Sequence, residues 1–168
     1  GTGVMRRVLV IGASRGIGPD CVRQYREAGL DVLATARDDA GLARLAALGA
    51  QAHRLDVSQA GAFDALASVL AAQPVDAALY VAGVFPQANA QVPPSRAEFD
   101  RTMHTNVFGA MQALVALGPH VRPQGRFVFL SSEMAHITSV DGSDAWAYRV
   151  SKAALNMAVA AAQKDWPA

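Results

Sequence analysis

Short apolar runs recur along the chain, and longer segments with the spacing of helices separate them. Four of the runs are continuously apolar rather than alternating, which is typical of strands that are buried on both faces of a parallel sheet. They cover residues 8–12, 32–36, 77–83 and 127–131, and residues 51–55 form a weaker fifth run. The spacing between the runs predicts helices at residues 18–28, 40–48, 59–72, 95–118 and 145–164.

This alternation of strand and helix predicts an α/β fold. Successive strand–helix–strand units make right-handed crossovers and build a Rossmann-type, doubly wound parallel sheet with helices on both faces. Ligands of such sheets bind at the carboxyl ends of the strands, where the strand order reverses. We expect one nucleotide-binding domain over residues 1–168 that also carries the catalytic residues. Pro93 and Pro94 mark a loop, and Gln124 and Gly125 mark a turn into the fifth strand.

The composition suits a globular domain and argues against several classes of partner. Of the 168 residues, 52% are hydrophobic and 17% are charged, which is ample apolar material for a core. The net charge is +1 and the charges are scattered, so neither nucleic acid nor a membrane surface is an expected partner. No apolar run approaches the ~20 residues of a membrane helix.

The start of the chain and its single cysteine bear on cellular location. Basic residues precede an apolar stretch, as in a signal peptide, but glycine and arginine soon interrupt it, so we interpret it as a buried strand. Residues 1–3 are typical of an expression remnant and are not assigned to the fold. Cys21 cannot form an internal disulfide and lies beside Val22 in a predicted helix, which favours a reduced, cytoplasmic protein with a packed thiol.

Glycine is concentrated where the first strand meets the first helix, in the stretch GASRGIG from Gly12 to Gly18. Glycines at such a turn let the backbone approach a pyrophosphate, and the amino end of the helix offers unpaired N–H groups and a favourable dipole. The spacing G-x-x-x-G-x-G differs from the general fingerprint G-x-G-x-x-G. The alternative is a purely structural turn, but its position after a buried strand favours nucleotide binding.

The tip of the second strand bears on which dinucleotide is bound. An acid near this position binds the ribose 2′-hydroxyl of NAD, but this strand ends in Ala36 and Arg37. A guanidinium binds phosphate through paired hydrogen bonds, so Arg37, helped by Arg15, suits the 2′-phosphate of NADP. The alternative is a solvated surface arginine, because Asp38 and Asp39 follow immediately. We predict NADP(H) in preference to NAD(H).

A tyrosine and a lysine lie four positions apart in AYRVSKAALN, so Tyr148 and Lys152 share one face of the last predicted helix. A free phenol has a pKa of about 10, and an adjacent ammonium favours the phenolate, which moves the tyrosine toward a range suited to acid–base work. The alternative is a packed tyrosine and a surface lysine, because a bare Y-x-x-x-K motif is short and frequent.

The surroundings of this pair favour the catalytic interpretation. The fifth predicted strand ends in hydroxyl side chains at the expected ligand edge, where a serine could hold a substrate oxygen beside the phenol. Asn106 lies in the middle of a predicted helix, where asparagine is a mediocre helix former. Its amide therefore either has a specific role or simply faces solvent.

Together these residues resemble the short-chain dehydrogenase/reductase family. The resemblance spans nearly the whole chain and depends on an ordered set of motifs: GASRGIG at 12–18, LDV at 55–57, AG at 82–83, the asparagine of TNVFG at 106, SS at 131–132 and YRVSK at 148–152. SSEMAHITS followed by AYRVSKAALN is similar to the C-factor/sniffer-type carbonyl reductase branch, in which the serine precedes the tyrosine by slightly more residues than usual.

The resemblance implies a role for each matching residue. Tyr148 would donate a proton to a carbonyl oxygen, or accept one in reverse, while Ser132 would polarise and orient that carbonyl. Lys152 would lower the phenol pKa and hold the nicotinamide ribose, and Asn106 would hold a water that links the lysine to solvent. The other cofactor contacts would come from Gly12, Ser14, Arg15, Gly16, Ile17, Gly18, Arg37, Asp56, Val57, Ala82 and Gly83.

Two departures from the family pattern stand out. The family's N-A-G after the fourth strand reads V-A-G here, so Val81 cannot supply an asparagine amide. The chain also stops at DWPA, where family members continue into another strand, a substrate-covering segment and a final strand and helix. We therefore expect a fold truncated after the catalytic helix, with the fifth strand an uncovered edge. A disordered tail absent from this sequence is favoured over a truncated gene product.

The leading hypothesis is an NADPH-dependent oxidoreductase that interconverts a carbonyl and an alcohol. The alternative is an NAD(P)-binding regulatory or signalling protein with little turnover, which the missing carboxyl-terminal portion favours. The resemblance also implies a homodimer or homotetramer built on the two long helices. No metal is expected, because the histidines are spread apart without ligand spacing, at His53, His104, His120 and His136.

Overall fold

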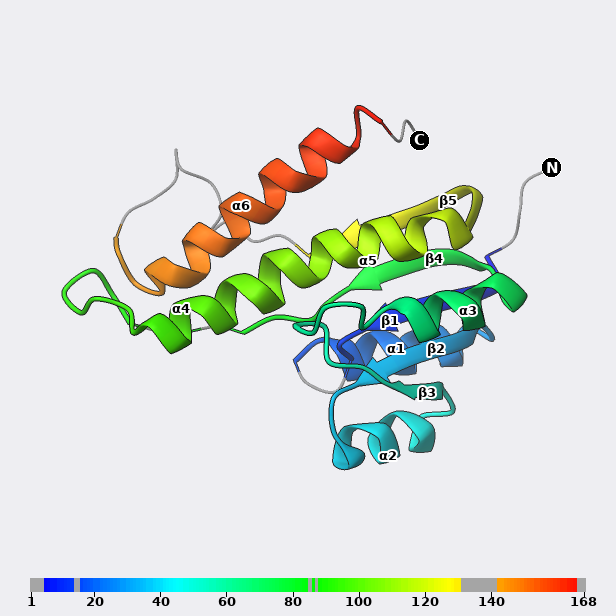
Figure 1. Cartoon of the computed structure of the whole chain (residues 1–168). Helices are drawn as coiled ribbons and strands as arrows, with labels where there is room; N and C mark the ends of the chain where they lie inside the picture. The colour runs from blue at the N-terminus through cyan, green and yellow to red at the C-terminus, as the bar shows by residue number, and fades with distance from the viewer. Residues whose placement is uncertain (1–4, 14–15, 85, 87, 131–141, 166–168) are drawn as a thin grey trace.

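The fold is a sheet of five parallel strands in the order β3-β2-β1-β4-β5 (Figure 1). The computed structural model describes residues 5–13, 16–84, 86, 88–130 and 142–165. The strands are Arg7–Ile11 (β1), Asp31–Ala36 (β2), Gln51–Arg54 (β3), Val75–Tyr80 (β4) and Val121–Phe129 (β5). The chain runs outward from β1 to β3 and then crosses to β4 and β5, so the strand order reverses between β1 and β4. This is the predicted doubly wound arrangement.

Helices connect the strands and cover both faces of the sheet (Figure 1). They are Gly18–Glu27 (α1), Asp39–Ala47 (α2), Asp64–Ala72 (α3), Arg96–Met103 (α4), Gly109–Leu117 (α5) and Trp146–Ala162 (α6). A π-helical turn, His104–Phe108 (η1), joins α4 to α5, and a 3-10 turn, Gly118–His120 (η2), leads into β5. Helix α6 packs against α4 and η1, so the two long helical segments lie side by side.

The central strand β1 is apolar from Val8 to Ile11 because its alternate side chains enter two different core clusters. Val8 of β1 belongs to the cluster that contains Val22 of α1 and Leu45 of α2. Leu9, the next residue, belongs to the other cluster, which contains Leu70 of α3 and side chains of α5 and α6. The central strand is therefore buried on both faces, which explains its continuous rather than alternating hydrophobicity.

The predicted helix at residues 59–72 is shorter in the structure. It begins at Asp64, and residues 59–63 form turns instead. Gly61 has a φ of 72° in this segment, a left-handed backbone conformation that a regular helix does not contain.

The predicted turn at Gln124 and Gly125 lies within β5 rather than before it, because β5 already begins at Val121. Gln124 has a φ of 69°, and the pairing of β4 with β5 shifts register between Val75 and Ala77. The chain therefore accommodates the glutamine–glycine pair as an irregularity inside the strand, as a β-bulge does.

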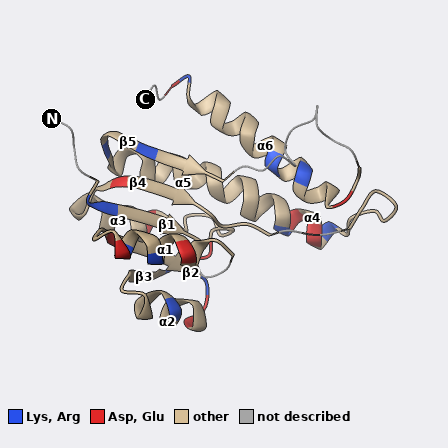
Figure 2. Ribbon diagram, turned by 180° about the vertical axis from the view of Figure 1, so that it is seen from behind, with Lys and Arg blue, Asp and Glu red and all other residues tan. Residues whose placement is uncertain are grey.

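Charge is unevenly distributed over the helices (Figure 2). Helix α5 has no charged residue, and α6 carries only Arg149 and Lys152. Four apolar side chains on these helices are half exposed or more: Met111 at 50%, Val115 at 69%, Val150 at 51% and Met157 at 71%. In the described parts of the chain, nevertheless, no helix is both long and apolar enough to span a membrane.

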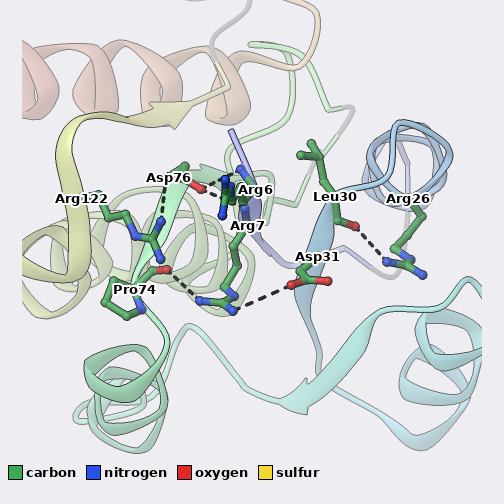
Figure 3. A network of polar contacts seen from close by, with 8 residues as sticks. All are labelled: Arg6, Arg7, Arg26, Leu30, Asp31, Pro74, Asp76 and Arg122. Carbon is green, nitrogen blue, oxygen red and sulfur yellow. Dashed lines mark hydrogen bonds and ion pairs between the residues drawn. The ribbon is translucent and has the colours of Figure 1, made fainter. Parts of the chain in front are cut away.

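At the amino end of the sheet, charged side chains join the strand ends to one another (Figure 3). Asp76 of β4 accepts hydrogen bonds from the backbone N–H groups of Arg6, at 2.8 Å, and Arg7, at 2.9 Å. It also pairs with Arg122 of β5 at 3.5 Å. Arg7 in turn donates to the Pro74 carbonyl at 3.3 Å. One carboxylate thus connects β1, β4 and β5.

Cys21 lies in α1, as predicted, and is partly buried. Burial raises the pKa of its thiol, and the neighbouring Asp20 carboxylate raises it further. Both effects disfavour the reactive thiolate, which agrees with a packing role for this side chain.

Candidate active site

The loop after β1 is held close to the neighbouring strands on both sides. Gly12 has a φ of 79°, and a Cβ added to it would lie 2.4 Å from the Cβ of Ala82, so the position requires glycine. Its N–H donates to the Thr35 hydroxyl at 2.8 Å, and the Ala13 N–H donates to the Thr35 carbonyl at 2.9 Å. Thr35 is fully buried in β2. The loop is therefore anchored to β2 and packed on the segment after β4 before α1 begins.

The other two glycines of the loop differ in what they contact. Gly18, the first residue of α1, packs so closely on the loop that a Cβ there would lie 2.5 Å from the Ala13 Cα. Gly16 has a φ of 64° and faces open space, with no described atom within 4 Å of an added Cβ. Ile17 between them is 51% exposed. The amino end of α1 is thus open on the side where unpaired N–H groups favour an anion.

Arg37 follows β2 directly, and its side chain is exposed. The two acids after it have other partners. Asp38 caps α2 by accepting a hydrogen bond from the Gly41 N–H at 2.8 Å, and Asp39 forms an ion pair with Arg54. Both carboxylates are therefore engaged with groups other than the Arg37 guanidinium.

Asp56 follows β3 and is fixed by a local turn. Its Oδ1 accepts hydrogen bonds from the Ser58 hydroxyl at 2.6 Å and the Ser58 N–H at 3.0 Å. The hydroxyl bond is the main reason that the pKa of Asp56 lies below its ordinary value, and Arg37 nearby lowers it further. Val57 is buried, and its carbonyl would lie 2.7 Å from a Cβ added to Gly109. An ionised carboxylate and a packed apolar residue thus lie beside the tip of β2.

Asn106 is fully buried, so the alternative that it faces solvent is wrong. Its Oδ1 accepts a hydrogen bond from the Val84 N–H at 2.8 Å, and its Nδ2 donates to the Val84 carbonyl at 3.0 Å. Nδ2 also donates to the Ser151 hydroxyl at 3.0 Å. A Cβ on Gly83 would lie 3.3 Å from Oδ1. The amide therefore joins the segment after β4 to helix α6.

The predicted helix at residues 95–118 is interrupted at the position of this asparagine. The π-helical turn His104–Phe108 contains Asn106, and its Thr105 carbonyl accepts a hydrogen bond from the Tyr80 hydroxyl at 2.6 Å. Tyr80 is 1% exposed in β4, and burial raises its pKa, which keeps the phenol neutral as a donor. Wide turns of this kind often occur at functional sites, and this one is held by β4.

Tyr148 and Lys152 lie one turn apart on α6, and the lysine Nζ is 5.6 Å from the centroid of the tyrosine ring. Lys152 is only 5% exposed. Its ammonium donates to the Leu130 carbonyl, just past β5, at 3.2 Å. The alternative of a surface lysine is therefore wrong, because this lysine is directed inward to the carboxyl end of β5.

The environment of the pair changes both pKa values. Burial raises the pKa of the Tyr148 phenol and lowers the pKa of the Lys152 ammonium. For Tyr148 this direction is opposite to the one predicted from the neighbouring ammonium. The physical reason is desolvation, which disfavours the phenolate, while the lysine donates its hydrogen bond to Leu130. A neutral phenol is the form that can donate a proton.

The structure brings most of the predicted site residues to the carboxyl end of the sheet. Some follow strand ends directly, and the others lie in the first helix or in η1 and α6, which pack together. The described ones are Gly12, Gly16, Ile17, Gly18, Arg37, Asp56, Val57, Ala82, Gly83, Asn106, Tyr148 and Lys152. Ser14, Arg15 and Ser132 lie outside the described residues.

This arrangement fits a dinucleotide. The open glycine at the amino end of α1 suits a pyrophosphate, and the exposed guanidinium after β2 suits a further phosphate. Among the described residues, by contrast, no group of three or more His, Cys, Asp or Glu side chains could hold a metal ion.

Sequence reasoning assigned no role to two residues that shape this site. Thr35 is the one hydroxyl in the apolar run at residues 32–36, and that contrast was a usable signal. Ser151 lies inside the motif YRVSK, but its partner Asn106 is 45 residues away. No local pattern could have indicated that contact.

A protein-family model for short-chain dehydrogenases, described as enoyl-(acyl carrier protein) reductase, matches residues 12–167. The chain belongs to the short-chain dehydrogenase/reductase family. This family consists of NAD(P)-dependent oxidoreductases, and the match covers both the glycine loop and the Tyr148–Lys152 pair.

Two curated relatives illustrate the similarity. A 1-hydroxy-2-glutathionyl-2-methyl-3-butene dehydrogenase from Rhodococcus sp. (strain AD45) is 30% identical over 159 residues, which cover 91% of this chain and 68% of the relative. Carbonyl reductase [NADPH] 1 from Bos taurus is 35% identical over 133 residues, which cover 74% of this chain and 48% of the relative. The chain thus spans 68% of the first relative's length and about half of the second's.

Solved structures agree with this assignment. A short-chain dehydrogenase/reductase from Burkholderia multivorans with bound NADP has a TM-score of 0.88 and 28% identity, and the match covers 96% of this chain and 74% of that one. The protein described as carbonyl reductase Sniffer of Caenorhabditis elegans has a TM-score of 0.81 and 25% identity, with 96% and 81% covered. The predicted family, and its carbonyl reductase branch, are thereby confirmed.

Proposed function

We propose that this short-chain dehydrogenase/reductase is an NADPH-dependent carbonyl reductase that interconverts a carbonyl and an alcohol. The observation that carries the proposal is the placement of Tyr148 and Lys152 beside the carboxyl end of β5. The open glycine loop follows β1 at the same edge of the sheet. An acid–base pair and a dinucleotide-binding loop therefore lie at the same edge of the sheet. Transfer of a hydride and a proton to one substrate requires both.

In this proposal, Tyr148 donates its phenolic proton to the substrate carbonyl oxygen as that oxygen becomes an alkoxide. Burial keeps the phenol protonated beforehand. Lys152, held inward by Leu130, stabilises the phenolate that remains after the transfer, because an ammonium favours a nearby anion. Ser132 polarises and orients the carbonyl. Asn106 holds the segment after β4 against α6, and we expect it to hold the water that links Lys152 to solvent.

The nicotinamide cofactor would supply the hydride when bound. We propose that the glycine loop, from Gly12 to Gly18, cradles its phosphates, and that Ala82 and Gly83 line a ribose. Asp56 and Val57 contact the adenine. Arg37 selects the 2′-phosphate of NADP(H) over NAD(H), and the bovine relative's name and the Burkholderia complex, with NADPH and NADP respectively, support this preference.

The test is NADPH oxidation against a panel of aldehydes, ketones and diketones, with Tyr148→Phe measured in parallel. Removing the proton donor should lower turnover by at least about 100-fold, while NADPH affinity, measured by fluorescence titration, changes little. Ser68→Ala, an exposed serine on α3, is the control and should behave like the parent. Equal turnover in parent and Tyr148→Phe would contradict the proposed role of the phenol.

NADPH binding without turnover on the whole panel would instead favour an NAD(P)-binding regulatory or signalling protein. That outcome would leave the cofactor site in place and would contradict the proposed reductase activity.

We further propose a homodimer or homotetramer that uses the exposed apolar side chains of α5 and α6, among them Met111, Val115 and Met157. Their removal from water would contribute about 25 cal/mol per Å². Light scattering at micromolar concentration should report at least two copies. A strictly monomeric mass would count against this assembly.

A further inference from the structure

Ser151 is the buried link between the π-helical turn and the turn of α6 that carries Tyr148. Its hydroxyl donates to the Tyr148 carbonyl at 2.7 Å and accepts from the Asn106 Nδ2 at 3.0 Å. Ser151 and Asn106 are each 0% exposed. The contact is therefore shielded from water, where a hydrogen bond contributes more than it would at the surface.

The directions of these hydrogen bonds follow from their partners. The Val84 N–H can only donate and the Val84 carbonyl can only accept, so they determine which end of the Asn106 amide is oxygen and which is nitrogen. The remaining N–H of Nδ2 points to Ser151 and must donate to it. Because a serine hydroxyl has a single proton, that proton is left for the Tyr148 carbonyl.

Two other residues at the start of α6 have described contacts that do not reach Asn106. The N-cap residue of α6, Ala145, has a φ of 51° and provides no capping hydrogen bond from its side chain. The described hydrogen bonds of the Arg149 side chain are to Asp144, immediately outside the helix. Ser151, by contrast, connects the first turn of α6 to the buried Asn106 amide.

We propose that Ser151 is a positioning residue, which holds the backbone of Tyr148 against Asn106 and so sets where the phenol and the Lys152 ammonium lie. The inference rests on the proposed function of Tyr148. It adds a continuous connection from the segment after β4, through Asn106 and Ser151, to the proton donor. A displacement of the cofactor-side segment at Val84 would therefore be transmitted to the phenol.

Removing the hydroxyl has a defined consequence. Ser151→Ala leaves the buried Asn106 N–H without an acceptor, which is unfavourable, and frees the Tyr148 carbonyl from one of its partners. The first turn of α6 then gains freedom, and water reaches the phenol more easily. Burial raises the pKa of Tyr148, so we expect this pKa to move back toward its ordinary value.

The experiment is a spectrophotometric titration of tyrosine in the full chain. The protein has three tyrosines, so the curve of Tyr148→Phe is subtracted to isolate Tyr148, in the parent and in the Ser151→Ala background. We expect the ionisation constant of Tyr148 to rise about threefold or more in Ser151→Ala. Ser68→Ala, which removes an exposed serine that bonds a carbonyl one turn earlier on α3, should leave it unchanged.

A second variant keeps the test decisive. Ser151→Cys replaces the hydroxyl with a slightly larger thiol, which is a weak hydrogen-bond partner, so it should shift the titration in the same direction even if Ser151→Ala does not fold. An unchanged Tyr148 titration in a folded Ser151 variant, with only a lower melting temperature, would overturn the proposal. The titration needs no substrate, so a lack of turnover in the parent would contradict the proposed reductase and not the role of Ser151.

If the parent turns over, the kinetics should also separate positioning from stability. Ser151→Ala should lower kcat about five- to tenfold with KM for the carbonyl nearly unchanged, because a misplaced proton donor affects the transition state more than ground-state binding. The kcat–pH profile should move with the titration. A change in KM alone would contradict the proposal.

Discussion

The two ends of the sheet are both rich in polar groups, but they use them differently. At the amino end, the Asp76 carboxylate accepts hydrogen bonds from backbone N–H groups, and the Arg7 and Arg26 side chains donate to backbone carbonyls (Figure 3). At the carboxyl end, no described atom lies within 4 Å of a Cβ added to Gly16, and Arg37 is exposed. The amino end therefore stabilises the fold, and the carboxyl end presents groups that a ligand can engage.

The direction of the helices explains this difference. In a parallel sheet with helical crossovers, the helices run opposite to the strands, so their carboxyl termini lie at the amino end of the sheet. The dipole there favours cations. Arg26, in the last turn of α1, donates to the Leu30 carbonyl at 2.9 Å, as this rule predicts. Helix amino termini at the other end favour anions, which is where the dinucleotide phosphates are expected.

The strongest test of this comparison substitutes one glycine at each end of the sheet by alanine. Gly12→Ala places a Cβ 2.4 Å from Ala82 at a φ of 79°, so we expect a loss of about 3 kcal/mol or more in the free energy of unfolding. NADPH binding should be lost with it. Gly29→Ala, at the amino end, has a similar φ of 84° but no described neighbour within 4 Å, and should cost about 1 kcal/mol.

Chemical denaturation and NADPH titration of both variants measure these effects. Equal destabilisation by the two substitutions would contradict the close packing inferred at Gly12.

The next largest effect is expected at the amino end. Asp76→Ala leaves the N–H groups of Arg6 and Arg7 without their acceptor, and the Asp76 side chain is only 18% exposed. We expect a loss of about 2 kcal/mol in the free energy of unfolding. NADPH affinity should stay within about twofold, because this network is remote from the carboxyl end. A large loss of NADPH affinity would contradict the inference that the amino end stabilises the fold and only the carboxyl end presents groups to a ligand.

The contribution of Asp76 should depend on pH in a defined direction. Burial disfavours its carboxylate, but the hydrogen bonds from the Arg6 and Arg7 N–H groups, with Arg122 nearby, outweigh burial and lower its pKa. A lowered folded-state pKa means that the stabilisation is complete above the unfolded value of about 3.9 and is lost as the pH falls through the folded value. The stability difference between the parent and Asp76→Ala should therefore persist down to about pH 4 and shrink below it. A difference that shrinks between pH 7 and 5 would contradict this assignment.

The smallest effect is expected for the exposed arginine at the ligand end. Arg37→Ala should reduce the preference for NADPH over NADH about tenfold, since a guanidinium–phosphate contact is lost, with no change in melting temperature. Arg23→Ala on α1, where the arginine is exposed and pairs with Asp20, is the matched control. Identical NADPH-to-NADH ratios in both variants would show that Arg37 is a solvated surface arginine.

Sequence reasoning predicted the elements more reliably than their ends. Strands β1, β2 and β4 were identified because burial on both faces leaves an uninterrupted apolar run, and the glycine loop because a tight turn into a helix requires glycine. The extra turns at residues 59–63, the bulge at Gln124 and the π-helical turn were missed. Each interrupts a regular element, and the local periodicity of apolar residues does not indicate where such an interruption falls.

In the candidate site, too, sequence reasoning predicted some features correctly and others wrongly. The spacing of Tyr148 and Lys152 placed them on one face of a helix, and the structure confirms that they are neighbours. The direction of the tyrosine pKa was predicted wrongly, because the sequence reports that an ammonium is near but not how deeply the phenol is buried.

The sequence by itself determined the alternation of strands and helices, the glycine turn and the tyrosine–lysine spacing, because each depends on residues that are close along the chain. Only the tertiary structure decided that Asn106 is buried, that Ser151 links it to Tyr148, and that Asp76 joins three strands. Asn106 and Ser151 lie 45 residues apart along the chain, and Arg6 and Asp76 lie 70 residues apart. Hydrogen bonds act over a few ångströms in space, so such partners are chosen only when the fold brings distant segments together.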